Sequence, residues 1–195
     1  MAQADDVLRF WLDECGPDLW FKQDPGLDAR ILERFLDTWE GAKEGRYSLW
    51  LTYATGALAY IIVTDQFSRN IFRGNAAAFS TDRAALSAAK SAIAKGWDMQ
   101  VDEPARQFFY LPLMHSESLS DQDRCVRLML ERMPQSGASN LLHARAHRDV
   151  IRRFGRFPTR NADLSRDSTA AEAAFVADHG YAKILQDLQR ESKAA

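Results

Sequence analysis

Apolar residues recur along the chain at the three- and four-residue spacing of amphipathic helices, and the period-two alternation of strands with Asn-Gly turns is missing. The stripe over 27–39 is the clearest example. It follows Asp24-Pro25, a capping residue with a proline suited to the first helical turn, and it stops before Gly45. The pattern therefore predicts an all-α fold.

Similar stripes and boundary residues predict the remaining helices. Thr169 and Glu172 have the spacing of a capping box, in which the two residues satisfy each other's backbone N–H groups at a helix start. A chain of 195 residues fits one domain, which we place at 1–181, with 182–195 as a C-terminal tail that is weakly helical or frayed. Other helices are expected at about 52–65, 81–95, 107–111, 120–133 and 138–154.

Composition and charge narrow the function classes. With 46% hydrophobic and 27% charged residues the chain is an ordinary globular protein, and its net charge of −2 gives no global attraction to nucleic acid or anionic membranes. The apolar run 58–63 is far short of the ~20 residues that a membrane span needs, and the N-terminus lacks the features of a secretion signal. Cys15 and Cys125 are isolated, which suits a reducing compartment. We expect a cytoplasmic protein with no nucleic acid, membrane or cofactor partner; the oligomeric state is left open.

Two polar segments, Asp65–Gly74 and Phe154–Thr169, share one plan. Each follows an apolar helix, carries an Arg-Asn pair, and leads through a further arginine towards a Ser/Thr/Asp helix start. The second segment overlaps a basic island that holds seven arginines between Arg145 and Arg166, against two aspartates. We predict that the two segments meet around one polar pocket.

Asp65 is expected at a helix C-terminus, where the helix dipole disfavours an anion by roughly 0.3–1 kcal/mol. It therefore needs a cationic partner, for which Arg69, Arg160 and Arg156 are candidates, since a guanidinium grips a carboxylate through two parallel hydrogen bonds.

Arg166 lies just before the helix start at Thr169, where backbone N–H groups and the dipole favour a phosphate or carboxylate. The second segment is thus the better candidate for an anion site. The alternative interpretation is that these arginine networks only latch loops onto the helical core.

Histidines provide further candidate chemistry. His143 and His147 are four residues apart on one predicted helix, but Arg145 lies between them and no His-Glu-x-x-His pattern is present, so no metal site is expected. We interpret His147 as a core or pocket-lining residue. His115 and Glu117 are candidates for a general acid/base pair, and a capping role for His115 is the equal alternative.

Three ordered motifs, Asp65–Asn70, Tyr110–Glu117 and Phe154–Asn161, resemble the DUF924 family of bacterial proteins of unknown function. The resemblance covers nearly the whole chain, from about residue 7 to residue 175. It implies antiparallel helical hairpins in a tetratricopeptide-like, right-handed superhelical array, although the regular repeat signature is missing.

The resemblance implies no reaction. Ser68 stands where the family pattern usually has proline, and Thr159 stands where it usually has histidine, so a catalytic role for that histidine fails here. The arginine and asparagine positions are kept.

Two functions follow from these observations. The first is an enzyme or binding protein with an Arg/Asn/His-lined pocket for a small anionic ligand, a phosphate or a carboxylate. The second is a helical-repeat interaction module for an acidic peptide or C-terminal carboxylate, with the Arg-Asn motifs as structural latches. The candidate catalytic residues are His115 and Glu117, and the candidate ligand-binding residues are Asp65, Gln66, Arg69, Asn70, Arg73, Arg156, Arg160, Asn161 and Arg166.

Overall fold

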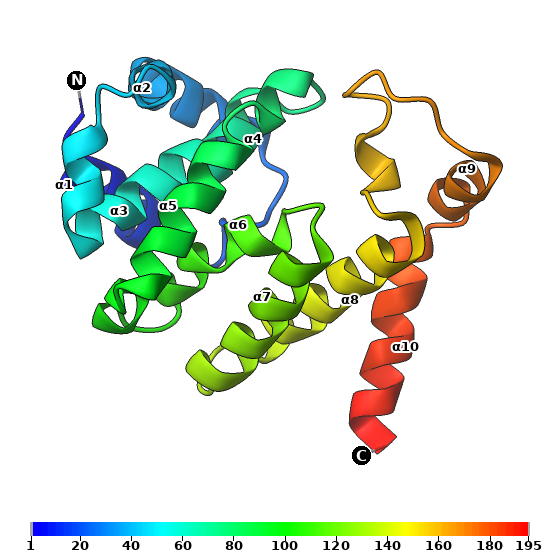
Figure 1. The fold of residues 1–195 in the computed structure, drawn as a ribbon. Helices are drawn as coiled ribbons and strands as arrows, with labels where there is room; N and C mark the ends of the chain where they lie inside the picture. Colours follow the sequence, from blue (N-terminus) through cyan, green and yellow to red (C-terminus); the bar gives the residue numbers. More distant parts are fainter. Residues whose placement is uncertain (1, 195) are drawn as a thin grey trace. The chain divides into compact units, whose positions relative to one another are not determined.

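The computed structural model describes residues 2–194, and the side chains up to residue 191. Within these residues every regular element is a helix and none is a strand, which confirms the all-α fold (Figure 1). In the same part of the chain, each helix is too short or too polar to cross a bilayer. The chain divides into two compact units, Met1–Pro112 (unit 1) and Leu113–Ala195 (unit 2). Our placement of 1–181 in one domain stays a prediction.

Unit 1 is organised around one continuous helical run. It consists of α3 (Ala54–Ile61), a π-helical stretch (Ile62–Phe67) and α4 (Ser68–Ile71). Helix α1 and helix α5 pack on α3, and α2 packs on the π-helical stretch and α4. The remaining elements of unit 1 are α1 (Ala4–Leu8), a π-helical stretch (Arg9–Cys15), α2 (Pro25–Lys43), α5 (Asp82–Ala94) and 3-10 turns at Ser48–Thr52, Ala76–Phe79, Trp97–Gln100 and Ala105–Phe109.

Large aromatic side chains fill the centre of unit 1. The ring centroids of Phe35 and Phe67 are 4.9 Å apart, those of Phe10 and Phe35 are 5.0 Å apart, and Trp11 meets Phe67 edge-on at 5.4 Å. All four side chains are buried. Burial of such rings is the main stabilising contribution, with about 0.5–1.5 kcal/mol more for each well-oriented pair.

Asp65 does not end a helix, so that expectation is wrong. The helical backbone continues through the π-helical stretch into α4, because Phe67 is part of the buried core and the Ser68 hydroxyl bonds back to the Thr64 carbonyl at 3.0 Å. The helix dipole therefore does not explain why Asp65 needs a cationic partner. Burial explains it instead, because Asp65 is only 1% exposed and a buried carboxylate must be paired.

The start of α2 follows the sequence signal, whereas Thr81 at the start of α5 makes no capping hydrogen bond with its side chain. Asp24 caps α2 by accepting hydrogen bonds from the backbone N–H groups of Gly26 at 2.8 Å and Leu27 at 3.1 Å. Thr81 is the first flanking residue of α5, but its hydroxyl is used elsewhere: it donates to the Thr64 carbonyl at 2.6 Å and accepts from the Trp39 indole at 3.3 Å. The Thr81 side chain thus joins the start of α5 to α2 and to the π-helical stretch Ile62–Phe67.

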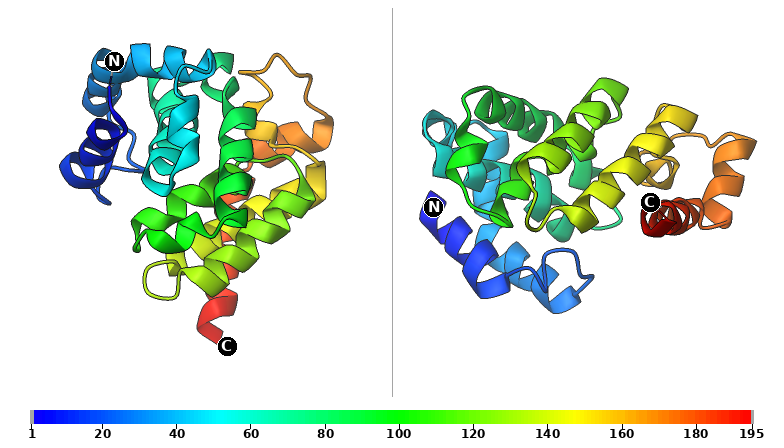
Figure 2. Two further views of the ribbon diagram at one scale, coloured as in Figure 1. Left: turned by 60° about the vertical axis from the view of Figure 1, so that its left-hand side comes forward. Right: turned by 90° about the horizontal axis from the view of Figure 1, so that it is seen from below.

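Unit 2 begins within α6 (Leu111–Met114) and contains a helical hairpin of α7 and α8, with α10 packed along α8 (Figures 1 and 2). Helix α8 has the predicted bounds and ends before Gly155, whose φ of 69° suits glycine. The elements of unit 2 are α7 (Leu119–Arg132), α8 (Ala138–Phe154), a 3-10 turn (Pro158–Arg160), α9 (Ala170–Ala177) and α10 (Gly180–Ala194).

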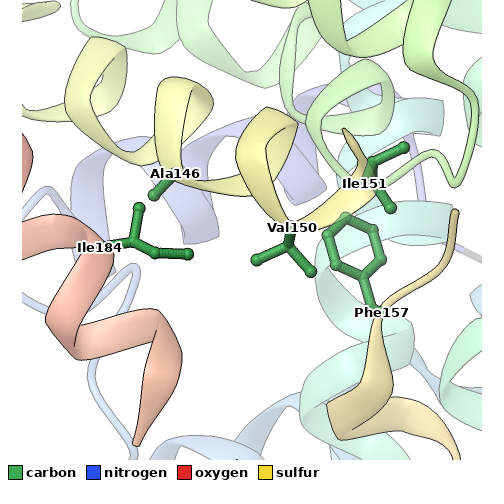
Figure 3. Packing of buried hydrophobic residues seen from close by; sticks show 5 residues of the cluster. All are labelled: Ala146, Val150, Ile151, Phe157 and Ile184. Carbon is green, nitrogen blue, oxygen red and sulfur yellow. The ribbon is translucent and has the colours of Figure 1, made fainter. Parts of the chain in front are cut away.

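The C-terminal segment is a helix that takes part in the core of unit 2. Figure 3 shows Ile184 of α10 facing α8, where Ala146 and Val150 lie, with Phe157 beside Val150 and Ile151. Ile184 is 6% exposed, so α10 contributes a buried side chain to this core. Removal of this helix exposes apolar surface on α8.

Candidate functional site

In unit 1 the polar segment is held to α2 by one carboxylate. Asp28 accepts two hydrogen bonds from Arg73, from Nε at 2.8 Å and Nη2 at 2.9 Å, and a third from Asn70 Nδ2 at 2.8 Å. Burial of Asp28 raises its pKa, but the hydrogen bonds from Arg73 and Asn70 outweigh burial and leave the pKa below its usual value. Asn70 of α4 and Arg73, two residues after its end, therefore fasten this segment to α2.

Arg69 lies between two acidic side chains. Its Nη1 is 3.3 Å from Asp65 Oδ1 and donates to the Asp65 carbonyl at 2.6 Å, and its Nη2 donates to Asp82 Oδ2 at 3.1 Å. The pairing of Asp65 with Arg69 is as predicted. Burial lowers the pKa of Arg69, but the two carboxylates outweigh burial and raise it overall. Gln66 also donates to Asp65 Oδ2, at 2.6 Å.

A cavity of about 360 Å³ in unit 1 shares no lining residue with this ion-pair network. Its walls come from α3, α5 and the two flanking 3-10 turns, and they include Tyr60, Ser87, Ser91 and Trp97 but none of the candidate arginines. The lining is uncharged, so this cavity does not suit an anion.

In unit 2, Arg166 and Glu117 form a two-point ion pair. Arg166 Nη1 donates to Glu117 Oε2 at 2.8 Å and Nη2 donates to Oε1 at 3.0 Å, while the backbone N–H of Phe157 donates to Oε1 at 2.8 Å. Burial of Glu117 raises its pKa, but Arg166 and the Phe157 amide outweigh burial and leave the pKa below its usual value. At neutral pH Glu117 is thus an anion that anchors the loop after α8.

Asn161 extends the same network. It is 2% exposed, it accepts from Arg166 Nε at 3.0 Å, and it donates to the Ser168 hydroxyl at 3.0 Å. Arg166 Nη2 also donates to the Phe157 carbonyl at 3.1 Å. The loop between the 3-10 turn and α9 is therefore fixed from within by side chains predicted to bind a ligand.

Arg156 forms the second two-point ion pair of unit 2. Its Nε and Nη2 donate to Glu172 at 2.6 and 2.8 Å, and Nη2 also donates to the Asp167 carbonyl at 2.8 Å. The predicted capping box of α9 is present: Thr169 N donates to Glu172 Oε2 and Glu172 N donates to Thr169 Oγ1. The hydrogen bonds from Arg156 and Thr169 lower the pKa of Glu172 to about 2. Protein carboxylates thus already occupy the place where we expected an anion beside Arg166.

A separate pocket of unit 2 lies where α8, the 3-10 turn, α9 and α10 meet, and its volume is about 280 Å³. Arg160 is not part of the lining, but its guanidinium carbon is 4.5 Å from the ring centroid of Phe157, which is. Most of the wall is apolar, and the polar contributions come from one imidazole and two hydroxyl-bearing side chains. The lining residues are Val150, Phe157, Pro158 and Phe175 together with His147, Thr159 and Tyr181.

Three of the polar side chains near this pocket are linked. The Tyr181 hydroxyl is 2.8 Å from His143 Nδ1 and 3.0 Å from His147 Nδ1, and His147 Nδ1 is also 2.8 Å from the His143 carbonyl. Burial lowers the pKa of His143, and burial with the nearby positive groups lowers that of His147 to about 3. Burial raises the pKa of the Tyr181 phenol. All three groups are therefore neutral near pH 7.

The structure places the candidate residues in two sets. Unit 1 holds Asp65, Gln66, Arg69, Asn70 and Arg73; unit 2 holds His115, Glu117, Arg156, Arg160, Asn161 and Arg166. The meeting of the two segments around one pocket stays a prediction. The same is true of the proposed acid/base pair.

His147 lines a pocket, as predicted, and the ring of His115 lies 6.5 Å from its ring. Sequence reasoning missed Tyr181 and Thr159 as pocket residues. Tyr181 has no local signal, because its partners lie on another helix more than thirty residues earlier. Among the described residues, no group of three or more His, Cys, Asp or Glu side chains is arranged to hold a metal ion.

Comparison with known proteins assigns the chain to a family. A family model described as a bacterial protein of unknown function, DUF924, matches residues 7–180. The chain is similar to a protein of unknown function, ATU0120, from Agrobacterium tumefaciens, with 39% identity and a TM-score of 0.83 over 90% of this chain and 97% of that one. No curated protein matches the chain. The chain belongs to the DUF924 family.

Proposed function

We propose that the protein binds a small anionic ligand, a carboxylate or a phosphate, in the pocket of unit 2. The pocket carries the proposal: its mostly apolar wall with a few convergent polar groups is typical of small-molecule sites, and its volume, about 280 Å³, suits only a small ligand. The apolar wall suits the body of the ligand, and Thr159 and His147 are available to orient it.

Charge supports an anion over a cation. The guanidinium carbon of Arg160, a residue outside the lining, is 4.5 Å from the ring centroid of Phe157, so a positive charge lies near one wall of the pocket. Unit 2 has 13 Lys and Arg residues against 11 Asp and Glu residues, although the whole chain carries a net charge of −2. The charge of unit 2 therefore favours a negatively charged ligand over a positively charged one.

Binding, and not turnover, is the activity that the geometry favours. Glu117 accepts three hydrogen bonds from protein donors, so its carboxylate is suited to anchoring the loop. His147, with a pKa of about 3, does not carry the proton that a general acid must deliver near pH 7.

A thermal-shift screen of small carboxylates and phosphate esters tests the proposal, because a ligand specific for the folded state raises stability by mass action, by about 2.7 kcal/mol at a hundredfold excess over Kd. We expect the strongest anion to stabilise the wild type and not Thr159→Trp, in which an exposed pocket residue becomes large enough to fill the mouth. Arg152→Trp, at an exposed position of α8 outside the lining, is the matched control. Equal shifts in both variants contradict the proposal.

A second candidate function is an interaction module for an acidic peptide or a C-terminal carboxylate in the cytoplasm. The two-point pairs of Arg156 and Arg166 favour it, because they are consistent with arginines that latch loops. The hairpin of α7 and α8 with α10 beside it supports a tetratricopeptide-like array. Binding of an acidic peptide without any response to small anions favours this candidate over the first.

A further inference from the structure

The cavity of unit 1 borders a face of α5 that carries only small side chains. Four residues with the helical spacing i, i+3, i+4 and i+7 share this face and line the cavity, namely Ala84, Ser87, Ala88 and Ser91. Helix α3, which packs on α5, adds the buried residues Ala57 and Tyr60 to the lining. The short side chains leave about 360 Å³ unfilled, within the range of about 300–1,000 Å³ typical of small-molecule sites.

Every residue that lines this cavity is uncharged. Tyr60 is the one lining side chain that titrates, and burial raises the pKa of its phenol, so it is neutral near pH 7. An ion that entered the cavity would lose hydrating water without gaining an opposite charge from the lining. The lining therefore favours a neutral ligand.

The charges around the cavity favour a neutral ligand as well. Unit 1 has 12 Lys and Arg residues against 16 Asp and Glu residues, so its overall field repels anions. Lys95 lies outside the lining, but its Nζ is 4.1 Å from the ring centroid of Trp97, a lining residue. This ammonium group repels a second cation at the Trp97 ring.

Hydroxyl groups supply the polar contacts. Ser87 and Ser91 are exposed and one turn apart on α5, and in the described part of the chain neither hydroxyl has a hydrogen-bond partner. The Tyr60 hydroxyl, in contrast, donates to the Ala42 carbonyl at 3.4 Å. Because a serine hydroxyl both donates and accepts, the serine pair suits a neutral group that does the same, which is an alcohol.

The rest of the lining suits a ring. The Trp97 indole and the Tyr60 ring are flat apolar surfaces, and Leu51 and two alanines add aliphatic contacts. A cavity of about 150 Å³ accommodates benzene, so about 360 Å³ leaves room for a ring with a side chain.

We propose that this cavity binds a small uncharged aromatic alcohol, whose ring packs against Trp97 and Tyr60 and whose hydroxyl bonds to Ser87 and Ser91. The site goes beyond the proposed function, because it lies in the other unit and takes a neutral molecule in place of an anion. Selectivity against charge follows from the lining, since the same ring with an ionised substituent finds no opposite charge there.

Four benzene derivatives of similar size test the proposal by NMR of the full chain at pH 7: benzyl alcohol, toluene, benzoate and protonated benzylamine. The signal to follow is the indole N–H of Trp97, identified as the one missing from Trp97→Phe. We expect benzyl alcohol to shift it saturably, and toluene to bind about three- to tenfold more weakly because it forms no hydrogen bond. Both ions should bind more weakly than benzyl alcohol by about tenfold or more. An ion that shifts the signal as readily as the alcohol, or no shift with the alcohol, overturns the proposal.

Two substitutions test the place of binding. Ser91→Leu puts a larger side chain into the cavity from an exposed position of α5 and should abolish binding of benzyl alcohol. Ala94→Leu, also exposed on α5 but outside the lining, is the matched control and should bind like the wild type. Equal binding by these two variants contradicts the proposal.

A double variant tests the hydroxyl contacts. Ser87→Ala with Ser91→Ala should remove the preference for benzyl alcohol over toluene and leave the affinity for toluene unchanged. A preference that survives in the double variant overturns the assignment of the alcohol to the serine pair. The proposed function is judged separately, because benzoate is expected to shift residues of the unit 2 pocket and not Trp97.

Discussion

Replacing Glu117 by glutamine should release the loop after α8 without changing the size of the side chain. In Glu117→Gln the amide oxygen would still accept from the Phe157 N–H, but the new NH2 group would face Arg166, which is also a donor. Arg166 would lose the hydrogen bond from Nη1 and the negative charge of its partner, and it would keep the bond from Nη2 to the amide oxygen. Its other partners, Asn161 and the Phe157 carbonyl, are unchanged.

The expected loss of stability is about 2 kcal/mol. Removing one partner of a fully buried pair costs about 3–5 kcal/mol, whereas exposed pairs contribute about 0–1 kcal/mol. The Arg166 and Glu117 side chains are 23% and 30% exposed, so solvent screens part of the charge and the estimate falls between these limits. The matched control is Asp123→Asn, since Arg148 and Asp123 are 3.5 Å apart with Asp123 46% exposed. The loss of stability in Asp123→Asn should be below about 0.5 kcal/mol.

The assay must report on unit 2 separately. All five tryptophans lie in unit 1, so tryptophan fluorescence follows that unit and not this loop. Amide hydrogen exchange over 155–168 is the suitable measurement, because 2 kcal/mol corresponds to a loss of protection of about 30-fold. Equal protection in Glu117→Gln and Asp123→Asn would refute the view that this ion pair fixes the loop.

Three further predictions concern other parts of the structure. Thr81→Val should lower the free energy of unfolding by about 1–2 kcal/mol and change tryptophan emission, since the Trp39 indole N–H loses its buried acceptor. Unchanged stability in urea unfolding would count against this prediction. Because the pKa of Glu172 is depressed, the start of α9 should keep its stability above pH 4.5 and lose it as the pH falls towards 2. Amide hydrogen exchange at α9 measures this, and a loss of protection already at pH 6 would contradict it. The unfolded state binds a proton at His147 more readily than the folded state, so the stability gained from the neutral ring is complete above pH 6.5 and declines as the pH falls towards 3. An NMR titration in which the ring titrates near pH 6.5 would contradict the depressed pKa.

The sequence predicted those features that depend on neighbouring residues. The Asp24 cap, the Thr169-Glu172 capping box and the bounds of α8 follow from local hydrogen-bonding rules and helical periodicity, and all are present. The end of the helix at Asp65 was wrong, because the burial of Phe67 overrides the polar residues that suggested a stop. Tertiary packing, which periodicity does not contain, decided that boundary.

The partners of the arginines depend on contacts far along the chain. Nothing near Arg73 in the sequence points to Asp28, and nothing near Arg166 points to Glu117, since 45 and 49 residues separate these pairs. Local reasoning correctly favoured arginine for two-point recognition of carboxylates, but the carboxylates belong to the protein itself. The same holds for Tyr181, which α10 brings to His143 and His147.

The central claim, that an anion binds in the pocket of unit 2, is tested most directly by NMR of the full chain during a titration with benzoate. We predict saturable shift changes concentrated at His147, Phe157, Thr159 and Phe175, the residues that line the pocket. Saturable changes confined to residues outside this lining, or none at all, would contradict the account.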